Sequence, residues 1–316
     1  MTRSLFKVLR IALTAWLAAW TMSAAPASAA PCASSCLQPG DHRIAIWSGG
    51  LLRFYLVHVP ESYTGQDQVP LLLDLHGFSS YAADERKWSG QLRESDRRGF
   101  IAVWPDGVAL SWNAYGCCFL GNALVVDDVA FLRSVIGEMK RRSNIDDGRV
   151  YVTGISNGGG MAQRMACEAA DIVTAVVSVS FPLNSDQCRP ARPISVTAIA
   201  ATGDNTINYY GSSAPLGLPN NLLGLPLGVQ GARESLAAWK RLNGCSDALT
   251  RVQLRDDVRL EEYRRCGRGT RAGLVTIVGG THVLYSGYIG LGYNGDYVAP
   301  IDAATYMWDH VFTDRD

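Results

Sequence analysis

The chain has 316 residues, of which 47% are hydrophobic, and this is enough for one large globular domain with its own core. Charged residues make up only 18% of the sequence, and the formal net charge at pH 7 is zero. Because no run of five or more lysines and arginines occurs, the sequence lacks the basic patches of a nucleic-acid-binding protein.

The first 29 residues are predicted to be a cleaved signal peptide. Three basic residues precede an apolar run over residues 11–22, and small residues at 27–29 form a cleavage pattern. The apolar run is shorter than the ~20 residues that a membrane span needs. We therefore expect residues 30–316 to form a single secreted domain, extracellular or periplasmic, with no membrane attachment after cleavage.

Apolar runs alternate with helical patterns along the rest of the chain. Segments 42–48 and 52–59 flank a Gly49-Gly50 turn and are predicted to pair as antiparallel strands. Short, almost continuous apolar runs are typical of strands buried on both faces, and they cover 71–75, 100–104, 150–153, 175–179, 194–201 and 274–278. Helical periodicity is found at 127–142, 231–242 and 303–312. The alternation predicts an α/β fold, a mostly parallel central sheet with helices on both faces.

The most informative motif is Gly154-Ile155-Ser156-Asn157-Gly158, which has the form Gly-x-Ser-x-Gly. A buried strand leads into it and a helical stretch follows, and this is the context of a nucleophile elbow in the α/β-hydrolase fold. The glycines allow a tight turn that raises the Ser156 hydroxyl above the sheet edge. The alternative is a glycine-rich turn that contains a serine by chance.

A serine nucleophile needs a histidine base, and in this fold the base follows the nucleophile in the chain. Two histidines follow Ser156. His282 comes directly after an apolar strand, whereas His310 lies within a helical pattern and is interpreted as a surface residue. We therefore predict His282 as the base.

The orienting acid is predicted to be Asp204, which lies between Ser156 and His282 in the chain and follows the buried strand 194–201. The other candidates in this window do not follow such a strand and are interpreted as solvated loop charges. They are Asp186, Asp247, Asp256 and Asp257. The loop 203–230 between the acid strand and the next helix is rich in Gly, Pro, Asn and Leu, and it is predicted to be a long loop or a small lid.

The strand 71–75 ends in His76-Gly77-Phe78. In α/β-hydrolases the loop after this strand and the residue after the nucleophile donate backbone N–H groups to the oxyanion. This predicts Phe78 and Asn157 as the oxyanion hole, with His76 expected to contact the substrate. A simple strand-ending turn is the alternative for His76-Gly77.

Eight cysteines in an exported chain indicate disulfides, and no CxxC pair or nearby histidine cluster indicates a metal. We predict local bridges Cys167–Cys188 and Cys245–Cys266, and no metal or cofactor. The neighbours Cys117 and Cys118 are expected to find distant partners, or one of them stays free.

With these motifs the chain resembles a family of secreted esterases related to polyhydroxybutyrate depolymerases and to feruloyl and acetylxylan esterases. The segments that carry the resemblance are 50–60, Leu75-His76-Gly77, 104–107, 111–114, Cys117-Cys118, 126–132 and 154–159. The sequence departs from the family at the lead-in to Asp204 and in the segment 281–287 after the base. The resemblance implies carboxylic ester hydrolysis and leaves the exact substrate open.

Three further residues are candidate substrate contacts. Trp112 and Asn113 offer an aromatic wall with a polar handle, although Trp112 in the core and Asn113 in a turn is an equally good interpretation. Tyr285 lies in the altered segment beside His282. The predicted reaction is hydrolysis of a small or polymeric ester, with no nucleic-acid partner and with the oligomeric state undetermined. The alternatives are amide hydrolysis by the same residues and a non-catalytic domain that binds glycan or polymer.

Overall fold

The computed structural model describes residues 36–115, 126–183, 186, 188–211, 230–286 and 300–312. These residues belong to one unit, Pro31–Asp316. The predicted signal peptide and the cysteines Cys32, Cys117 and Cys118 lie outside the described residues. Within the described residues, no helix is long and apolar enough to cross a membrane.

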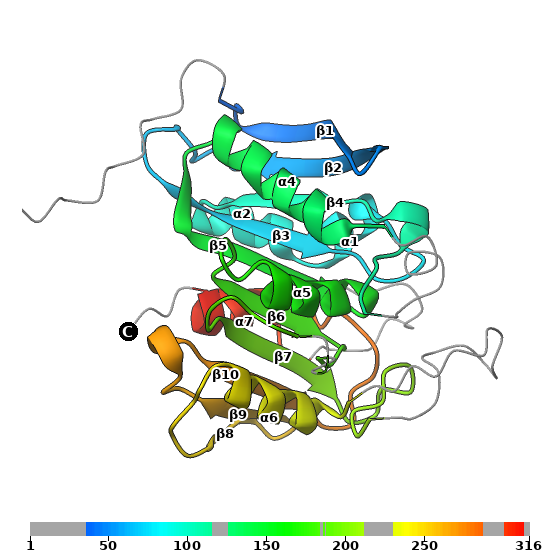
Figure 1. The fold of residues 1–316 in the computed structure, drawn as a ribbon, viewed down its shortest axis with the longest axis vertical. Coiled ribbons are helices and arrows are strands. Elements are labelled where there is room, and N and C mark those ends of the chain that lie inside the picture. Colours follow the sequence, from blue (N-terminus) through cyan, green and yellow to red (C-terminus); the bar gives the residue numbers. More distant parts are fainter. Residues whose placement is uncertain are drawn as a thin grey trace, which may run out of the picture. The chain divides into compact units, whose positions relative to one another are not determined.

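A ten-stranded sheet, in the order β1-β2-β4-β3-β5-β6-β7-β10-β9-β8, runs through the described part of the chain (Figure 1). The strands are β1 (Gly40–Ser48), β2 (Leu51–Val59), β3 (Val69–Leu75), β4 (Ile101–Pro105), β5 (Ile145–Ile155), β6 (Ala175–Val179), β7 (Ser195–Ala201), β8 (Thr250–Arg255), β9 (Val258–Tyr263) and β10 (Ala272–Ile277). Strands β4, β3, β5, β6, β7 and β10 are parallel, while β1, β2, β9 and β8 pair antiparallel at the two edges. The predicted mostly parallel sheet is confirmed.

Helices cover both faces of this sheet (Figure 1). They are α1 (Ala82–Trp88), α2 (Gln91–Arg98), α4 (Asp128–Arg142), α5 (Asn157–Glu168), α6 (Ala232–Leu242) and α7 (Ala303–Met307), which continues as a π-helical turn over Trp308–Phe312. Neighbouring residues of a strand face opposite layers. Thus Leu71 and Leu73 pack in the core layer with α4, α5 and α6, and Leu72 packs in the other layer with α7.

The sequence patterns predict most of these elements, but they predict neither the short helices nor one hairpin. The short helices α1 and α2 had no predicted counterpart. The hairpin β8–β9 also had no predicted counterpart. Its apolar residues alternate with polar ones only briefly, at Val252, Leu254, Val258 and Leu260, and every residue of β8 is exposed. Charged side chains on an edge strand protect it from pairing with other chains, so this sequence is compatible with a strand after all.

The carboxyl ends of the parallel strands lie at one edge of the sheet. Leu75 at the end of β3 pairs with Gly154 of β5, and Ile277 at the end of β10 pairs with Ala201 of β7. The loops that follow these four strands therefore begin at the same edge, which is where open α/β sheets bind ligands.

Candidate active site

Ser156 forms the tip of a strained turn between β5 and α5. Its backbone has φ 54° and ψ −123°, a conformation that costs energy in a residue with a side chain. Two backbone hydrogen bonds hold it there: its N–H donates to the Val179 carbonyl at 2.8 Å, and its carbonyl accepts from the Gly160 N–H at 2.9 Å. The side chain is partly exposed. This geometry is that of a nucleophile elbow.

The two glycines of the motif are required because the elbow presses against the end of β3. A Cβ on Gly158 would lie 2.1 Å from the Leu75 carbonyl oxygen and 2.5 Å from that of His76. A Cβ on Gly154 would lie 2.6 Å from the same Leu75 oxygen. The Gly-x-Ser-x-Gly spacing therefore reflects a close backbone approach, which a chance glycine-rich turn does not need.

Asp204 and His282 are joined by a hydrogen bond of 2.8 Å between Oδ2 and Nδ1. The other carboxylate oxygen of Asp204 accepts from the N–H groups of Thr206 and Ile207, each at 2.8 Å. Asp204 is 4% exposed, whereas the His282 side chain reaches the surface in part. Because an ionised carboxylate only accepts, Nδ1 carries the proton and Nε2 is left as the basic nitrogen.

The loops that carry the acid and the base are fastened to each other. The Gly203 N–H donates to the Gly280 carbonyl at 2.9 Å, and the Gly279 N–H donates to the Thr202 hydroxyl at 2.8 Å. A Cβ on Gly203 would lie 2.8 Å from the Gly280 oxygen, so this contact also depends on a glycine. The Asp204–His282 pair is thus set by the backbone on both sides. Among the described residues, no hydrogen bond joins Ser156 to His282.

Tyr285 is a buried support of the His282 loop. The side chain is 2% exposed, and its hydroxyl donates to the carbonyl of Thr281, the residue before the histidine. Its carbonyl accepts from the Ala303 N–H at 2.7 Å, at the start of α7. A Cβ on Gly280 would come within 2.6 Å of the Tyr285 hydroxyl. We predicted Tyr285 as a substrate contact, and its burial instead indicates that it positions the loop.

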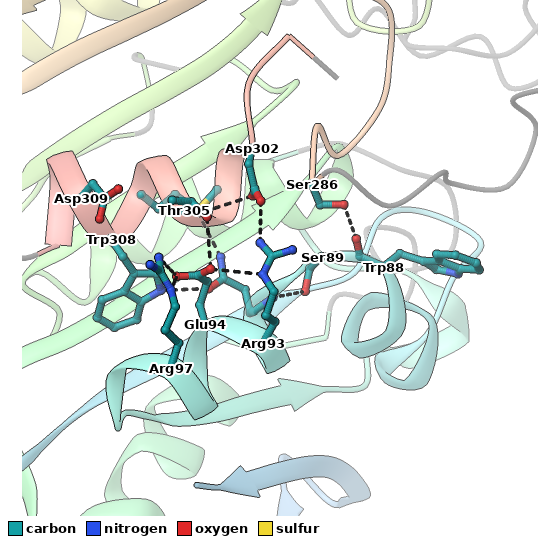
Figure 2. Close-up of polar contacts among 12 residues, drawn as sticks. Trp88, Ser89, Arg93, Glu94, Arg97, Ser286, Asp302, Thr305, Trp308 and Asp309 are labelled. Atoms are coloured by element: carbon teal, nitrogen blue, oxygen red, sulfur yellow. Dashed lines mark hydrogen bonds and ion pairs between the residues drawn. The ribbon is translucent and has the colours of Figure 1, made fainter. Parts of the chain in front are cut away.

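Behind this loop, a network of charges connects α2 to α7 (Figure 2). Its centre is Glu94, which is 1% exposed and accepts from Arg97 at 2.6 Å and from Arg98 at 2.7 Å. Burial raises the pKa of Glu94, but the hydrogen bonds from Arg98 and Arg97 outweigh burial and hold the pKa below its usual value. Thr305 of α7 also donates to Glu94, at 3.1 Å.

Two outer contacts extend the network to the His282 loop (Figure 2). Arg93 of α2 pairs with Asp302 at 2.6 Å, next to the residue that binds the Tyr285 carbonyl. Ser286 donates from its hydroxyl to the Trp88 carbonyl at the end of α1. The sequence contains no motif for this network, because its members are scattered over three segments far apart in the chain.

His76 is completely buried and neutral. Its Nε2 accepts from the Gly107 N–H at 2.9 Å, so the proton is on Nδ1, which donates to the Gly77 carbonyl at 2.8 Å. Burial lowers the pKa of His76, although the hydrogen bond to Gly77 opposes this. The imidazole therefore braces the turn that leads to Phe78. We expected His76 to contact the substrate, but no part of its side chain reaches the surface.

Trp112 and the Asn157 side chain form a second brace beneath the elbow. The Asn157 side chain accepts from the Trp112 N–H at 2.6 Å and donates to the Trp112 carbonyl at 3.0 Å. The Trp112 indole donates to the His76 carbonyl at 2.9 Å, and the ring is fully buried. The backbone N–H of Asn113 donates to the Asp128 carboxylate at 2.8 Å, as expected of a residue that fixes a turn. The geometry favours the core-and-turn interpretation of Trp112 and Asn113 over substrate contact.

Phe78, which the sequence predicts as an oxyanion donor, lies in the loop beside the Ser156 turn. Within the described residues, its N–H donates to no acceptor, and its ring is 41% exposed. A Cβ on the preceding Gly77 would lie 3.7 Å from the Ser156 Cβ, so the loop passes directly beside the elbow. The next residue, Ser79, has φ 62° and donates from its N–H to the Leu110 carbonyl at 2.9 Å.

A pair of buried acids lies on β3 and α1, the two elements that flank the loop carrying Phe78. Asp74 of β3 and Glu85 of α1 are 1% and 3% exposed, and their side chains share a hydrogen bond. Burial raises the pKa of Asp74 to about 6, against hydrogen bonds from Ser89 and Trp104. Burial, followed by the charge of Asp74, raises the pKa of Glu85 well above its usual value. Both shifts favour the protonated form of the pair, in which one carboxyl group donates its proton to the other.

The alternative base and acids lie elsewhere. His310 is exposed in the C-terminal turn, where its ring lies tilted against that of Tyr306, with the ring centroids 4.8 Å apart. Asp247 accepts from the Arg264 N–H at 2.7 Å, and Asp186 and Asp256 are exposed. In the described part of the chain, none of them pairs with a histidine.

Both predicted local disulfides are confirmed. Cys167 at the end of α5 bonds to Cys188, and Cys245 after α6 bonds to Cys266 after β9. Cys36 is also disulfide-bonded.

Comparison with known proteins agrees with this geometry. Feruloyl esterase B of Piromyces equi is 30% identical over 247 residues, which cover 75% of this chain and 44% of that protein, so the chain spans less than half of that relative. Feruloyl esterase D of Neurospora crassa is 26% identical over 267 residues, covering 78% of this chain and 82% of that protein. No model of a protein family matches the chain.

Among solved structures, an acetyl xylan esterase from Aspergillus awamori aligns with a TM-score of 0.55 at 12% identity, over 85% of this chain and 98% of that one. At this identity the alignment shows the fold alone, and it agrees with the mostly parallel sheet described above. The chain is therefore similar in sequence to proteins named feruloyl esterases, and its fold is the α/β-hydrolase fold.

Proposed function

We propose that this protein hydrolyses carboxylic esters through an acyl-enzyme, with Ser156 as nucleophile, His282 as general base and Asp204 as the orienting acid. The observation that carries the proposal is the 2.8 Å hydrogen bond between Asp204 and His282, on loops that start at the same sheet edge as the strained Ser156 turn. A histidine oriented by a buried carboxylate next to a serine elbow is the arrangement that acyl transfer requires.

The reaction follows from the tautomer of His282. Nδ1 faces Asp204, so Nε2 removes the proton as the Ser156 oxygen attacks the ester carbonyl carbon. The protonated imidazole then gives this proton to the leaving alcohol, and the acyl group stays on the serine. A water molecule, deprotonated by Nε2, attacks the acyl-enzyme and releases the carboxylic acid. Asp204 stabilises the imidazolium in both halves of the reaction.

The oxyanion of each tetrahedral intermediate would be held by the N–H groups of Phe78 and Asn157. Removing such a donor typically costs about 3–4 kcal/mol of transition-state stabilisation. The supports of this loop are His76, which binds the Gly77 carbonyl, and Trp112, which binds the His76 carbonyl. We therefore assign positioning roles to His76, Trp112, Asn113 and Tyr285.

The acyl group is proposed to lie against apolar side chains next to the oxyanion loop. Phe78, Tyr81 and Leu110 are 41%, 49% and 46% exposed, and the Ser79–Leu110 hydrogen bond brings their segments together. Exposed aromatic side chains of this kind suit an aromatic or extended acyl group better than acetate. Two relatives are named feruloyl esterases. We therefore propose an arylpropenoyl or similar apolar acyl ester of a polysaccharide, hydrolysed outside the cytoplasm, where disulfides persist.

Covalent labelling tests the nucleophile. A fluorophosphonate probe is expected to label the purified protein once, on Ser156, and Ser156→Ala is expected to lose both labelling and ester turnover by several orders of magnitude while it stays folded. An unlabelled but folded protein would favour the non-catalytic glycan-binding alternative. Activity on an anilide equal to that on the matched ester would favour amide hydrolysis.

Substitution of the acid tests the pairing. Asp204→Asn is expected to leave the imidazole in the wrong tautomer and lower kcat by up to ~10⁴. Asp256→Asn is the control, because Asp256 is exposed in the β8–β9 turn and is expected to leave kcat unchanged. If the Asp204 variant kept most of its activity, the assignment of the acid would be wrong although Ser156 could still be the nucleophile.

The substrate class is tested with a panel of esters on the mature protein. The panel contains p-nitrophenyl esters of increasing chain length, methyl ferulate, acetylated xylan and hydroxybutyrate oligomers. The proposal expects the highest kcat/KM on the ferulate ester. A preference for acetylated xylan or for hydroxybutyrate oligomers would keep the mechanism and replace the acyl group.

A further inference from the structure

A groove of about 410 Å³ lies on the hairpin β8–β9, and the proposed reaction does not use it. Its walls include Arg251 and Gln253 of β8, Arg259 and Glu261 of β9, and Arg233 from the first turn of α6. Three guanidinium groups therefore face a single carboxylate. The stretch 230–271 that builds the groove carries ten basic and six acidic side chains, whereas the whole chain is neutral.

The strand register explains why these side chains lie together. Arg251 is opposite Glu261, and Gln253 is opposite Arg259. Residues directly opposite in an antiparallel pair project from the same face of the sheet, and so do residues two apart on one strand. All four side chains therefore share one face of the hairpin, and Arg233 joins them through a 2.9 Å bond from its Nε to Glu261.

Glu261 neutralises only part of this positive charge. It is 4% exposed and accepts from the Nε of Arg233 at 2.9 Å and from the Nε of Arg251 at 3.2 Å. Because Arg251 binds through Nε, its two Nη groups are not used in that pair. Arg259 is exposed and forms no ion pair with any described residue. The groove thus keeps a net charge of about +2, from three arginines and one glutamate.

The chemistry of the walls defines the ligand. A guanidinium group is a planar fork of donors that matches the two oxygens of a carboxylate, and it stays charged at every physiological pH. A volume of several hundred Å³ accommodates a sugar-sized group. The groove is open at the sheet edge, where every residue of β8 is exposed, so a long chain can pass through it. Besides the charged and amide side chains, the walls contain Val252 and Leu260, and they include no aromatic residue that could anchor a peptide side chain.

We propose that this groove binds carboxylate groups of an acidic oligosaccharide, such as a chain that carries uronic acid residues. The anion site follows from the groove alone, and the choice of a saccharide over a free organic acid rests on the proposed function, in which the ester is part of a polysaccharide. The groove holds the acidic chain at a distance from Ser156 while an ester on that chain is hydrolysed.

Binding is measured by isothermal titration calorimetry on the mature protein with disulfides intact. The probes are trigalacturonate, the neutral xylotriose, monomeric galacturonate and a tri-glutamate peptide. Arg259→Gln is the test variant, because Arg259 has no ion pair to lose. Arg268→Gln is its control, since Arg268 is an exposed arginine on the 3₁₀ turn Gly267–Gly269, outside the groove.

The wild-type protein and Arg268→Gln are expected to bind trigalacturonate, and Arg259→Gln is expected to bind it about tenfold more weakly, as for the loss of one hydrogen bond to a charged group. Affinity should fall as salt is added, and xylotriose should not bind. Equal affinity of Arg259→Gln and wild type would overturn the site. Tighter binding of monomeric galacturonate or of tri-glutamate would overturn the saccharide chain as its ligand.

Turnover of p-nitrophenyl butyrate is measured on the same samples and separates this inference from the proposed function. Arg259→Gln is expected to hydrolyse this small neutral ester at the wild-type rate. A protein that binds trigalacturonate but hydrolyses no ester would refute the proposed function and leave the anion groove in place. A protein that hydrolyses esters but binds no acidic saccharide would do the reverse.

Discussion

The buried pair Asp74–Glu85 predicts how the stability of this protein depends on pH. Both side chains are raised in pKa in the folded state, mainly by burial, and Glu85 is raised further by the charge of Asp74. A group whose folded pKa is raised binds more protons in the folded state than in the unfolded state. Its contribution to stability is complete below the unfolded pKa and is lost as the pH rises through the folded pKa.

The size of the effect follows from the shift. For Asp74 the folded pKa is about 6 against an unfolded value of 3.8. One extra bound proton changes the free energy of unfolding by about 1.4 kcal/mol per pH unit, so Asp74 alone accounts for a loss of about 3 kcal/mol over its whole titration, of which about 2 kcal/mol falls between pH 4 and pH 6. Glu85 adds a further loss at higher pH, because its pKa is raised well above the usual value.

Glu85→Gln is the informative change. An amide keeps the shape of the side chain and can donate to Asp74 without a shared proton, and it removes the repulsion between the two acids. We expect the variant to be more stable than wild type at pH 8. The expected gain is about 1–3 kcal/mol, which is the usual cost of a buried polar group without a suitable partner. At pH 4, where wild-type Asp74 and Glu85 are both protonated, this advantage should disappear.

The assay is urea unfolding followed by tryptophan fluorescence at pH 4, 6 and 8. Glu61→Gln is the matched control, because it makes the same chemical change at an exposed acid in the turn after β2. The control should follow the wild-type curve. If Glu85→Gln and wild type lost stability with the same slope from pH 4 to pH 8, the two carboxyl groups would not share a proton and the reasoning would fail.

Two further changes probe the supports of the site. Tyr285→Phe removes the hydrogen bond to the Thr281 carbonyl. It is expected to lower kcat by about tenfold to 10²-fold with little change in KM, because the base His282 would be slightly misplaced. An unchanged kcat with an unchanged pH profile would contradict the positioning role. Gly158→Ala would set a Cβ 2.1 Å from the Leu75 oxygen, and it is expected to destabilise the fold by about 3 kcal/mol or more in urea unfolding, beyond the usual cost of overpacking. Gly137→Ala on α4 is the control, because its Cβ would meet nothing closer than 3.6 Å, and a similar loss in both variants would show that the elbow is not the cause.

The sequence predicts those parts of the site in which one residue type is the only one that fits. Gly158 faces a backbone oxygen, and Ser156 and Asp204 both follow the largely buried carboxyl-terminal parts of β5 and β7. The pairing of Asp204 with His282 follows from this, since parallel neighbours bring both loops to one edge. Cys167–Cys188 was predictable from its short separation in the chain.

Other parts of the site depend on contacts between distant segments, and a linear pattern does not contain them. His76 and Tyr285 stand beside motif residues and were predicted to contact the substrate, and for Trp112 substrate contact was one of two equal interpretations. Each of the three is buried and donates a hydrogen bond to a backbone carbonyl. Proximity to a catalytic residue in the chain is equally compatible with a residue that supports it. Only burial decides between the two roles, and burial is set by the packing of α1, α5 and α7.

The conformation of Ser156 explains why so many supports are needed. A residue held at a positive φ persists only if its neighbours determine it more strongly than its own preference opposes it. Here the Ser156 N–H donates to the Val179 carbonyl of the next strand, and the Leu75 carbonyl packs against Gly158 on the other side. The Asn157 side chain is hydrogen-bonded to Trp112. Each contact comes from a different element, so no single loop can relax without the others. The energy stored at Ser156 is therefore a property of the whole sheet edge, and this is why small changes there, such as one methyl group on Gly158, are expected to affect both stability and turnover.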